Sequence, residues 1–181
     1  MSQHDATTGE CVCFECMRKR VAGTEQAFLA GESRMRKVRL RIPPEAGWQS
    51  EAEWVWVEDV GNGRFALRGV PYYYYGLSFD DIVRVELRDG LPEIVEVATR
   101  GGHSTYRLIA KGGFESEVAR KILKALTDLG CDVERNTTSH LAIDVPPQTD
   151  VHAVYDLLEK GEQSGVFEFE EGHCGHSLRS E

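Results

Sequence analysis

Two amphipathic segments in the second half of the chain, 115–130 and 149–161, constrain the fold most strongly. In each segment the apolar residues recur mainly three or four positions apart, which is the spacing of one face of an α-helix. The remaining residues are polar, so each helix should cover one side of a sheet and keep its other face in water. The residues expected on the buried faces are Val118, Ile122, Leu126, Leu129, Val151, Val154, Tyr155 and Leu158.

Short strand-like stretches surround these helices. They cover 104–111, 131–138, 140–146 and 165–171, so the expected order is β-α-β-β-α-β. That order predicts a ferredoxin-like domain, a four-stranded antiparallel sheet with both helices on one side. The other side of the sheet then needs a cover, either the first half of the chain or a second copy of the protein.

The first half reads as strands joined by tight turns. The stretches 37–43, 53–70 and 81–99 alternate apolar and polar residues, with turn signals at Gly61-Asn62-Gly63 and Asp89-Gly90. About five short strands are best closed as a small antiparallel barrel. The predicted fold class is therefore α+β. It comprises an N-terminal extension 1–33, a small β-barrel-like domain 34–101, a ferredoxin-like domain 102–172 and a C-terminal tail 173–181.

Charge and hydropathy narrow the functional class. The formal net charge of -9 argues against general nucleic-acid binding, which needs a basic face. Residues 34–41 are locally rich in Arg and Lys, which indicates an outward strand face or a local contact with nucleic acid or an acidic partner. No membrane span is expected, and the polar start lacks the apolar centre of a secretory signal, which favours the cytoplasm.

Cysteine and histidine residues cluster near both ends of the 181-residue chain. Such clusters can supply the four ligands of a zinc ion if the two ends meet. Redox-sensitive thiols, or cysteines without a role, are the alternatives. No cofactor is otherwise expected. The candidate zinc ligands are Cys11, Cys13, Cys16, His173, Cys174 and His176.

The stretch 101–107, Gly-Gly-His-Ser-Thr-Tyr-Arg, contains the residue types of nucleophilic catalysis. A nucleophile and its base must come within hydrogen-bond reach of each other. His103 and Ser104 are adjacent on an expected strand and therefore point to opposite faces. We accordingly expect a strand entry rather than a catalytic loop.

The same stretch should place a row of donors on one face of the strand. His103, Thr105 and Arg107 share a face at the two-residue period of a strand. The planar fork of Arg107 suits a carboxylate, and Asp80 or Asp81 is the expected partner. This row would be a polar network that joins the two domains, or a ligand site.

Four consecutive tyrosines occupy 72–75. Two of them can be buried while the alternate pair stays outward, and exposed aromatic residues are enriched at recognition surfaces. Tyr73 and Tyr75 are the candidates for binding. Core packing with the hydroxyls at the rim is the alternative.

Three short motifs are specific enough to compare with known families. They are Tyr75-Gly76 followed by Asp80-Asp81, Gly102-His103-Ser104-Thr105 with Arg107, and Glu170-Glu171-Gly172. Through these motifs, residues 37–172 resemble a bacterial family catalogued as domain of unknown function four-two-six-five. The resemblance implies a bacterial protein in the cytoplasm, and it carries over no activity. The extension and the tail fall outside it.

The sequence as a whole favours a non-enzymatic binding module whose partner is another protein or a second copy of the chain. A small-molecule-sensing domain is the first alternative, and a hydrolase that uses His103 is the second. The candidate binding residues are Tyr73, Tyr75, Asp80, Asp81, His103, Thr105 and Arg107.

Overall fold

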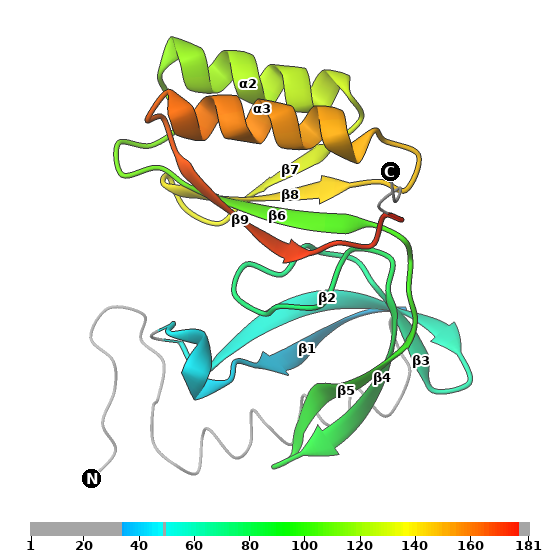
Figure 1. Ribbon diagram of the computed structural model, residues 1–181. Helices are drawn as coiled ribbons and strands as arrows, with labels where there is room; N and C mark the ends of the chain where they lie inside the picture. Colours follow the sequence, from blue (N-terminus) through cyan, green and yellow to red (C-terminus); the bar gives the residue numbers. More distant parts are fainter. Residues whose placement is uncertain (1–33, 49, 178–181) are drawn as a thin grey trace, which may run out of the picture.

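The first half of the chain closes into a barrel of five strands (Figure 1). The computed structural model describes residues 34–48 and 50–177. Consecutive strands pair antiparallel, and the barrel closes where β1 and β5 meet in parallel register at Arg39 and Glu93. The elements are β1 (Met35–Arg41), the 3-10 turn η1 (Pro44–Ala46), β2 (Ala52–Gly61), β3 (Arg64–Leu67), β4 (Ile82–Arg88) and β5 (Leu91–Thr99).

Alternate residues of these strands form the interior of the barrel, as their two-residue period predicts. The predicted tight turns are also present, because Asn62 and Asp89 adopt φ angles of 56° and 55° and each precedes a glycine at positive φ. The buried core residues of the barrel are Val38, Leu40, Val55, Val57, Phe65, Leu67, Leu77 and Val83.

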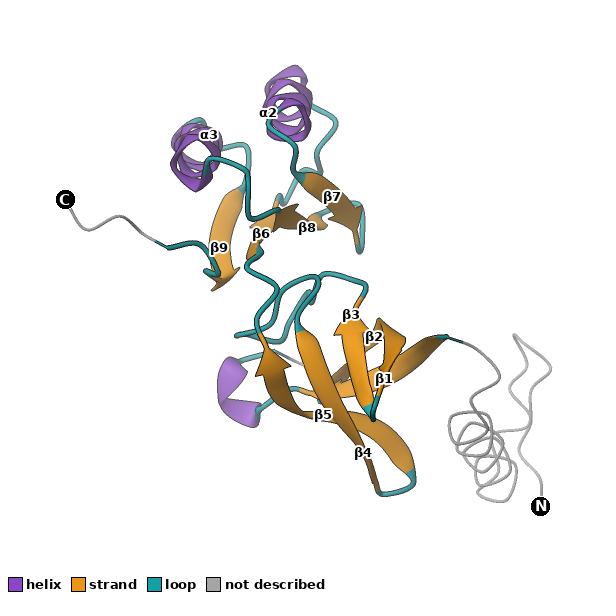
Figure 2. Cartoon of the chain, turned by 90° about the vertical axis from the view of Figure 1, so that its right-hand side faces the viewer, coloured by secondary structure: helices purple, strands orange, loops and turns teal. Residues whose placement is uncertain are grey.

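The second half forms a four-stranded sheet with the order β7-β8-β6-β9 and antiparallel neighbours. Both helices lie on the same side of this sheet, away from the barrel (Figures 1 and 2). Ser116 and Asp150 cap the helices by accepting hydrogen bonds from the first-turn amides. The elements are β6 (Ser104–Ile109), α2 (Glu117–Asp128), β7 (Asp132–Arg135), β8 (His140–Val145), α3 (Val151–Gln163) and β9 (Glu168–His173).

The buried faces of the two helices differ in part from the expectation. Val118, Leu129 and Tyr155 were expected to be buried, and all three are exposed. On α2 the buried stripe runs through Ala119, so Val118 lies one residue, about 100° around the helix, away from the sheet. Ile122, Leu126, Val151, Val154 and Leu158 are buried as expected.

The first half of the chain covers the face of the four-stranded sheet that carries no helices. The contact is made by the segment 68–81 between β3 and β4, which lies between the two sheets (Figure 1). A backbone hydrogen bond of 2.9 Å from the Gly76 amide to the Gly172 carbonyl ties this segment to β9. Among the described helices, none is long and apolar enough to cross a membrane.

Candidate functional site

Arg107 fastens segment 68–81 to the second sheet. Its side chain is completely buried. Nε donates to the Pro71 carbonyl at 3.2 Å, Nη1 donates to Glu170 Oε1 at 2.9 Å, and Nη2 donates to the Tyr74 carbonyl. The guanidinium carbon lies 4.4 Å from the centre of the Tyr75 ring. The Tyr75 hydroxyl donates to Glu170 Oε2 at 2.6 Å, so one carboxylate and one guanidinium hold the loop.

The expected pairing of Arg107 with Asp80 or Asp81 is wrong. β6 lies between β8 and β9, and the residue opposite Arg107 on β9 is Glu170. Asp81 accepts hydrogen bonds from the amides of Ser78 and Gly101 and from Arg100, while Asp80 pairs with Arg68. The two aspartates therefore fix the corner between the barrel and β6.

His103 and Thr105 share a face with Arg107, as the alternation predicts. His103 Nδ1 lies 2.9 Å from both carboxylate oxygens of Asp144. Thr105 Oγ1 lies 2.9 Å from Ser78 Oγ in segment 68–81. The row is thus a polar joint between the two sheets, and the motifs that carry the family resemblance meet at this joint.

Ser104 lies on the opposite face and holds the C-terminal segment. Its Oγ accepts from the Gly175 amide at 2.9 Å and lies 2.7 Å from His176 Nδ1. His176 Nε2 lies 3.1 Å from the Pro146 carbonyl, which can only accept, so Nε2 carries a proton and donates to it. Both ring nitrogens of His176 are therefore engaged.

The predicted zinc site falls only partly within the described residues. Cys11, Cys13 and Cys16 lie outside them. In 34–48 and 50–177, no group of three His, Cys, Asp or Glu side chains is placed to hold a metal ion. A zinc site that used His176 would first have to break its contacts with Ser104 or Pro146.

A second group of side chains, which sequence reasoning missed, gathers beside the joint. We call it the aromatic groove. Trp54 and Trp56 on β2 are 44% and 46% exposed, because they alternate with valines that face the barrel core. The detectable signal was the stretch Trp-Val-Trp-Val at 54–57, which is apolar on both faces. The groove comprises Trp48, Trp54, Trp56, Tyr72, Tyr73 and His140.

Ring contacts tie the parts of this groove together. The Tyr73 ring centre lies 5.0 Å from that of Trp48 and 5.4 Å from that of His140. The Asn136 amide donates to the Tyr73 hydroxyl at 2.8 Å. Tyr73 is therefore a half-buried wall and not a free ring, whereas Tyr75, the other candidate, stacks on Arg107.

Two cavities flank Tyr73. One of about 340 Å³ lies between β2 and β7. The other, of about 400 Å³, lies beside Trp48 and His140. Three buried atoms on these walls have no hydrogen-bond partner among the described residues: Trp48 Nε1, Glu53 Oε1 and His140 Nε2. Buried polar atoms are normally paired, so each of these three atoms lacks a partner that it would be expected to have.

Burial shifts the titration of two of these groups. It raises the pKa of Glu53, which the loop amides and the charge of Arg107 partly oppose. It lowers the pKa of His140, and the charge of Arg107 adds to that effect. His140 is therefore neutral near pH 7. Its Nδ1 faces the Asn136 amide at 3.4 Å, so Nε2 carries the ring proton.

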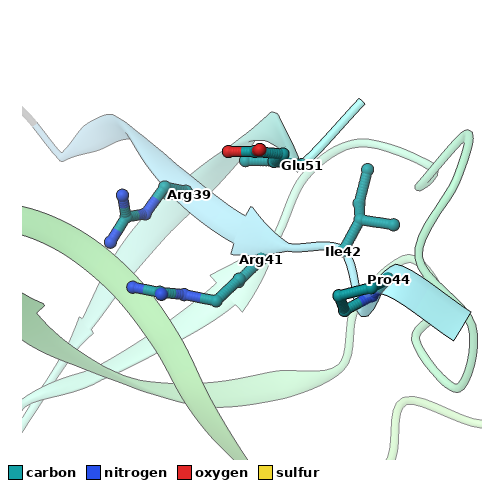
Figure 3. A pocket seen from close by; sticks show the side chains of 6 residues that line it. Arg39, Arg41, Ile42, Pro44 and Glu51 are labelled. Atoms are coloured by element: carbon teal, nitrogen blue, oxygen red, sulfur yellow. The ribbon is translucent and has the colours of Figure 1, made fainter. Parts of the chain in front are cut away.

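The basic strand expected at 34–41 is largely neutralised. Figure 3 shows Arg39 and Arg41 beside a cavity of about 270 Å³ at the end of β1. Arg39 pairs with Glu93 at 2.6 Å, and Arg41 pairs with both Glu93 and Asp89. These two arginines are thus bound to carboxylates on the neighbouring hairpin.

Comparisons with known proteins place the chain among uncharacterised relatives. A comparison with curated proteins found no match. One solved structure, described as a novel crystal structure of a hypothetical protein from Neisseria gonorrhoeae, is similar with a TM-score of 0.65 and 18% identity. The match covers 78% of this chain and 97% of that one, and at this identity it shows a shared fold. The family model described as Domain of unknown function (DUF4265) matches residues 53–169, so the chain belongs to that family.

Proposed function

We propose that this chain is a non-enzymatic binding module that recognises another protein, or a second copy of itself, through the aromatic groove. The observation that carries this proposal is that exposed Trp54 and Trp56 lie close to buried polar atoms that have no partner in the described part of the chain. Tryptophan is enriched among the residues that dominate binding energy at protein interfaces.

The geometry around the Gly-Gly-His-Ser stretch supports a non-enzymatic role. His103 is turned toward Asp144 and Phe79, and Ser104 faces the other side of the sheet. Ser104 contacts His176 instead, and both ring nitrogens of His176 lie beside polar atoms. These residues therefore serve structure in this conformation.

A small-molecule-sensing domain is the second candidate. The two cavities beside Tyr73, of about 340 and 400 Å³, favour it because they fall within the usual size of small-ligand sites. The groove serves both candidates, since a cavity can accept a free ligand or a single side chain of a partner.

The proposal also includes the fold of the second domain and the cellular location of the protein. We infer a ferredoxin-like domain for residues 102–172, which the strand order β7-β8-β6-β9 supports. We also infer a bacterial, cytoplasmic protein. The net charge of -9 and the paired arginines of β1 favour a protein partner over nucleic acid.

The test is capture of partners and measurement of self-association with matched variants. The joint change Trp54→Ala and Trp56→Ala should abolish capture of a partner from the native host. If the wild type instead sediments as a dimer, the same change should convert it to a monomer. Val118→Ala is the control, because Val118 is equally exposed at 46% but lies on α2. Equal binding by the double variant and the control would contradict the proposal.

A further inference from the structure

The cavity between β2 and β7 has an acidic and aromatic lining. Glu53 and Glu134 both line it, and no basic side chain does so within the described chain. Four aromatic side chains complete the walls. They are Trp54, Trp56, Tyr72 and Tyr73.

Only one of the two carboxylate oxygens of Glu53, which lines this cavity, accepts hydrogen bonds from the part of the chain that the structure describes. Its side chain is nine-tenths buried, and its Oε2 accepts from the amides of Tyr72 and Tyr73 at 3.1 and 2.9 Å. Its Oε1 is buried without a partner in the described residues. Glu134 Oε2 meets the Val70 amide at a long 3.4 Å. The cavity therefore has more acceptors than donors.

The buried guanidinium of Arg107 lies next to this cavity but donates no hydrogen bond to Glu53 or Glu134. Arg107 acts on Glu53 through its charge, but its nitrogens donate to Pro71, Tyr74 and Glu170. Lys37 is a second cation nearby, because its Nζ lies 5.1 Å from the centre of the Trp56 ring. Against these two positive charges stand three carboxylates, Glu53, Glu134 and Glu170. The site thus has an excess of negative charge in a partly dehydrated setting, where electrostatic attraction is strong.

We propose that this cavity binds an ammonium or guanidinium group, with Glu53 and Glu134 as counter-charges and the aromatic faces as walls. Aromatic faces attract cations, and carboxylates complete such sites. Burial raises the pKa of both glutamates, as expected for carboxylates that lack a bound cation. This inference rests on the proposed function, because it names what the groove recognises.

The bound group has two possible sources with the same chemistry. It is either a lysine or arginine side chain of a protein partner, or a free small amine. The net charge of -9 attracts both.

The test titrates the full chain with n-butylammonium and n-butylguanidinium, with n-butanol and butyrate as uncharged and anionic controls. Tryptophan fluorescence is the readout, because all three tryptophans of the chain line the two cavities of the groove. The cations should produce a saturable change, and the two controls should not.

Charge-removing variants locate the binding. Glu53→Gln keeps an acceptor for the loop amides, and Glu134→Gln covers the case in which the first variant fails to fold. Each should weaken cation binding by about tenfold or more, since a charged hydrogen bond is lost. Glu117→Gln is the control, because Glu117 is exposed on α2 and should leave binding unchanged.

A second arm separates the sources. A blocked peptide with one arginine is compared with the same peptide carrying citrulline, a neutral isostere. Arginine peptide binding tighter than butylguanidinium supports a protein source, and equal binding supports a free amine.

Two results would overturn the inference: butanol or butyrate binding as well as the cations, or unchanged cation binding in both glutamine variants. Partner capture that depends on Trp54 and Trp56 would in that case leave the proposed function standing. Failure of that capture together with cation binding would instead point to the small-molecule role.

Discussion

Replacing Arg107 with alanine should lower the free energy of unfolding by about 3 kcal/mol. The carbonyls of Pro71 and Tyr74 each lose a hydrogen bond from a charged donor, at about 1.5 kcal/mol each. Glu170 adds little, because its side chain is 34% exposed and can turn to water once unpaired. The loss is a large fraction of the stability of a typical domain.

Urea unfolding measures this effect, followed by tryptophan fluorescence for the barrel side and far-ultraviolet circular dichroism for the helices. Arg107→Lys should recover less than half of the loss, because an ammonium group cannot span three acceptors in one plane. Arg84→Ala is the matched control. Arg84 is 48% exposed and pairs with exposed glutamates, so its loss should stay within about 1 kcal/mol. A loss for Arg107→Ala no larger than that of the control would refute the reasoning.

Four further predictions follow from other parts of the molecule. Gly175→Ala should speed hydrogen exchange in 173–177, because a Cβ there would lie 2.2 Å from the His103 carbonyl oxygen; unchanged exchange would contradict the docked C-terminal segment. His140→Phe should flatten the loss of stability between about pH 7 and pH 5, measured as urea midpoints. The lowered pKa of His140 means that the unfolded chain takes up a proton that the folded chain resists, so wild-type stability falls as pH drops below 6.5. Leu126→Ala should cost about 2 to 5 kcal/mol in the same unfolding assay, since Leu126 is fully buried. Metal analysis should find about one zinc per chain if the terminal cysteines bind it, and none after deletion of 1–33; zinc-free wild type with titratable thiols would end that hypothesis.

Local spacing was enough to predict most of the elements. The three-to-four-residue repeats placed both helices, and the two-residue alternation placed the strands and their turns. The error at Val118 arose because a helix has several neighbouring apolar positions, and the packed partner decides which of them is buried. Alternation also placed His103, Thr105 and Arg107 on one face, because a strand's pleat is a local property.

The residues that contact His103, Thr105 and Arg107 could not be predicted from local sequence patterns. Arg107 contacts Glu170, which is 63 residues away, because β9 pairs with β6 and places the two residues opposite each other. The aromatic groove likewise needs Trp48 from the barrel and His140 from β8 to come together. A strand's period tells which side a residue faces. Only the order of strands in the finished sheet, set by long-range packing, decides what it meets there. The sequence by itself thus determined the elements and the faces of the strands, whereas the tertiary structure decided the exact buried faces of the helices, the joint and the groove.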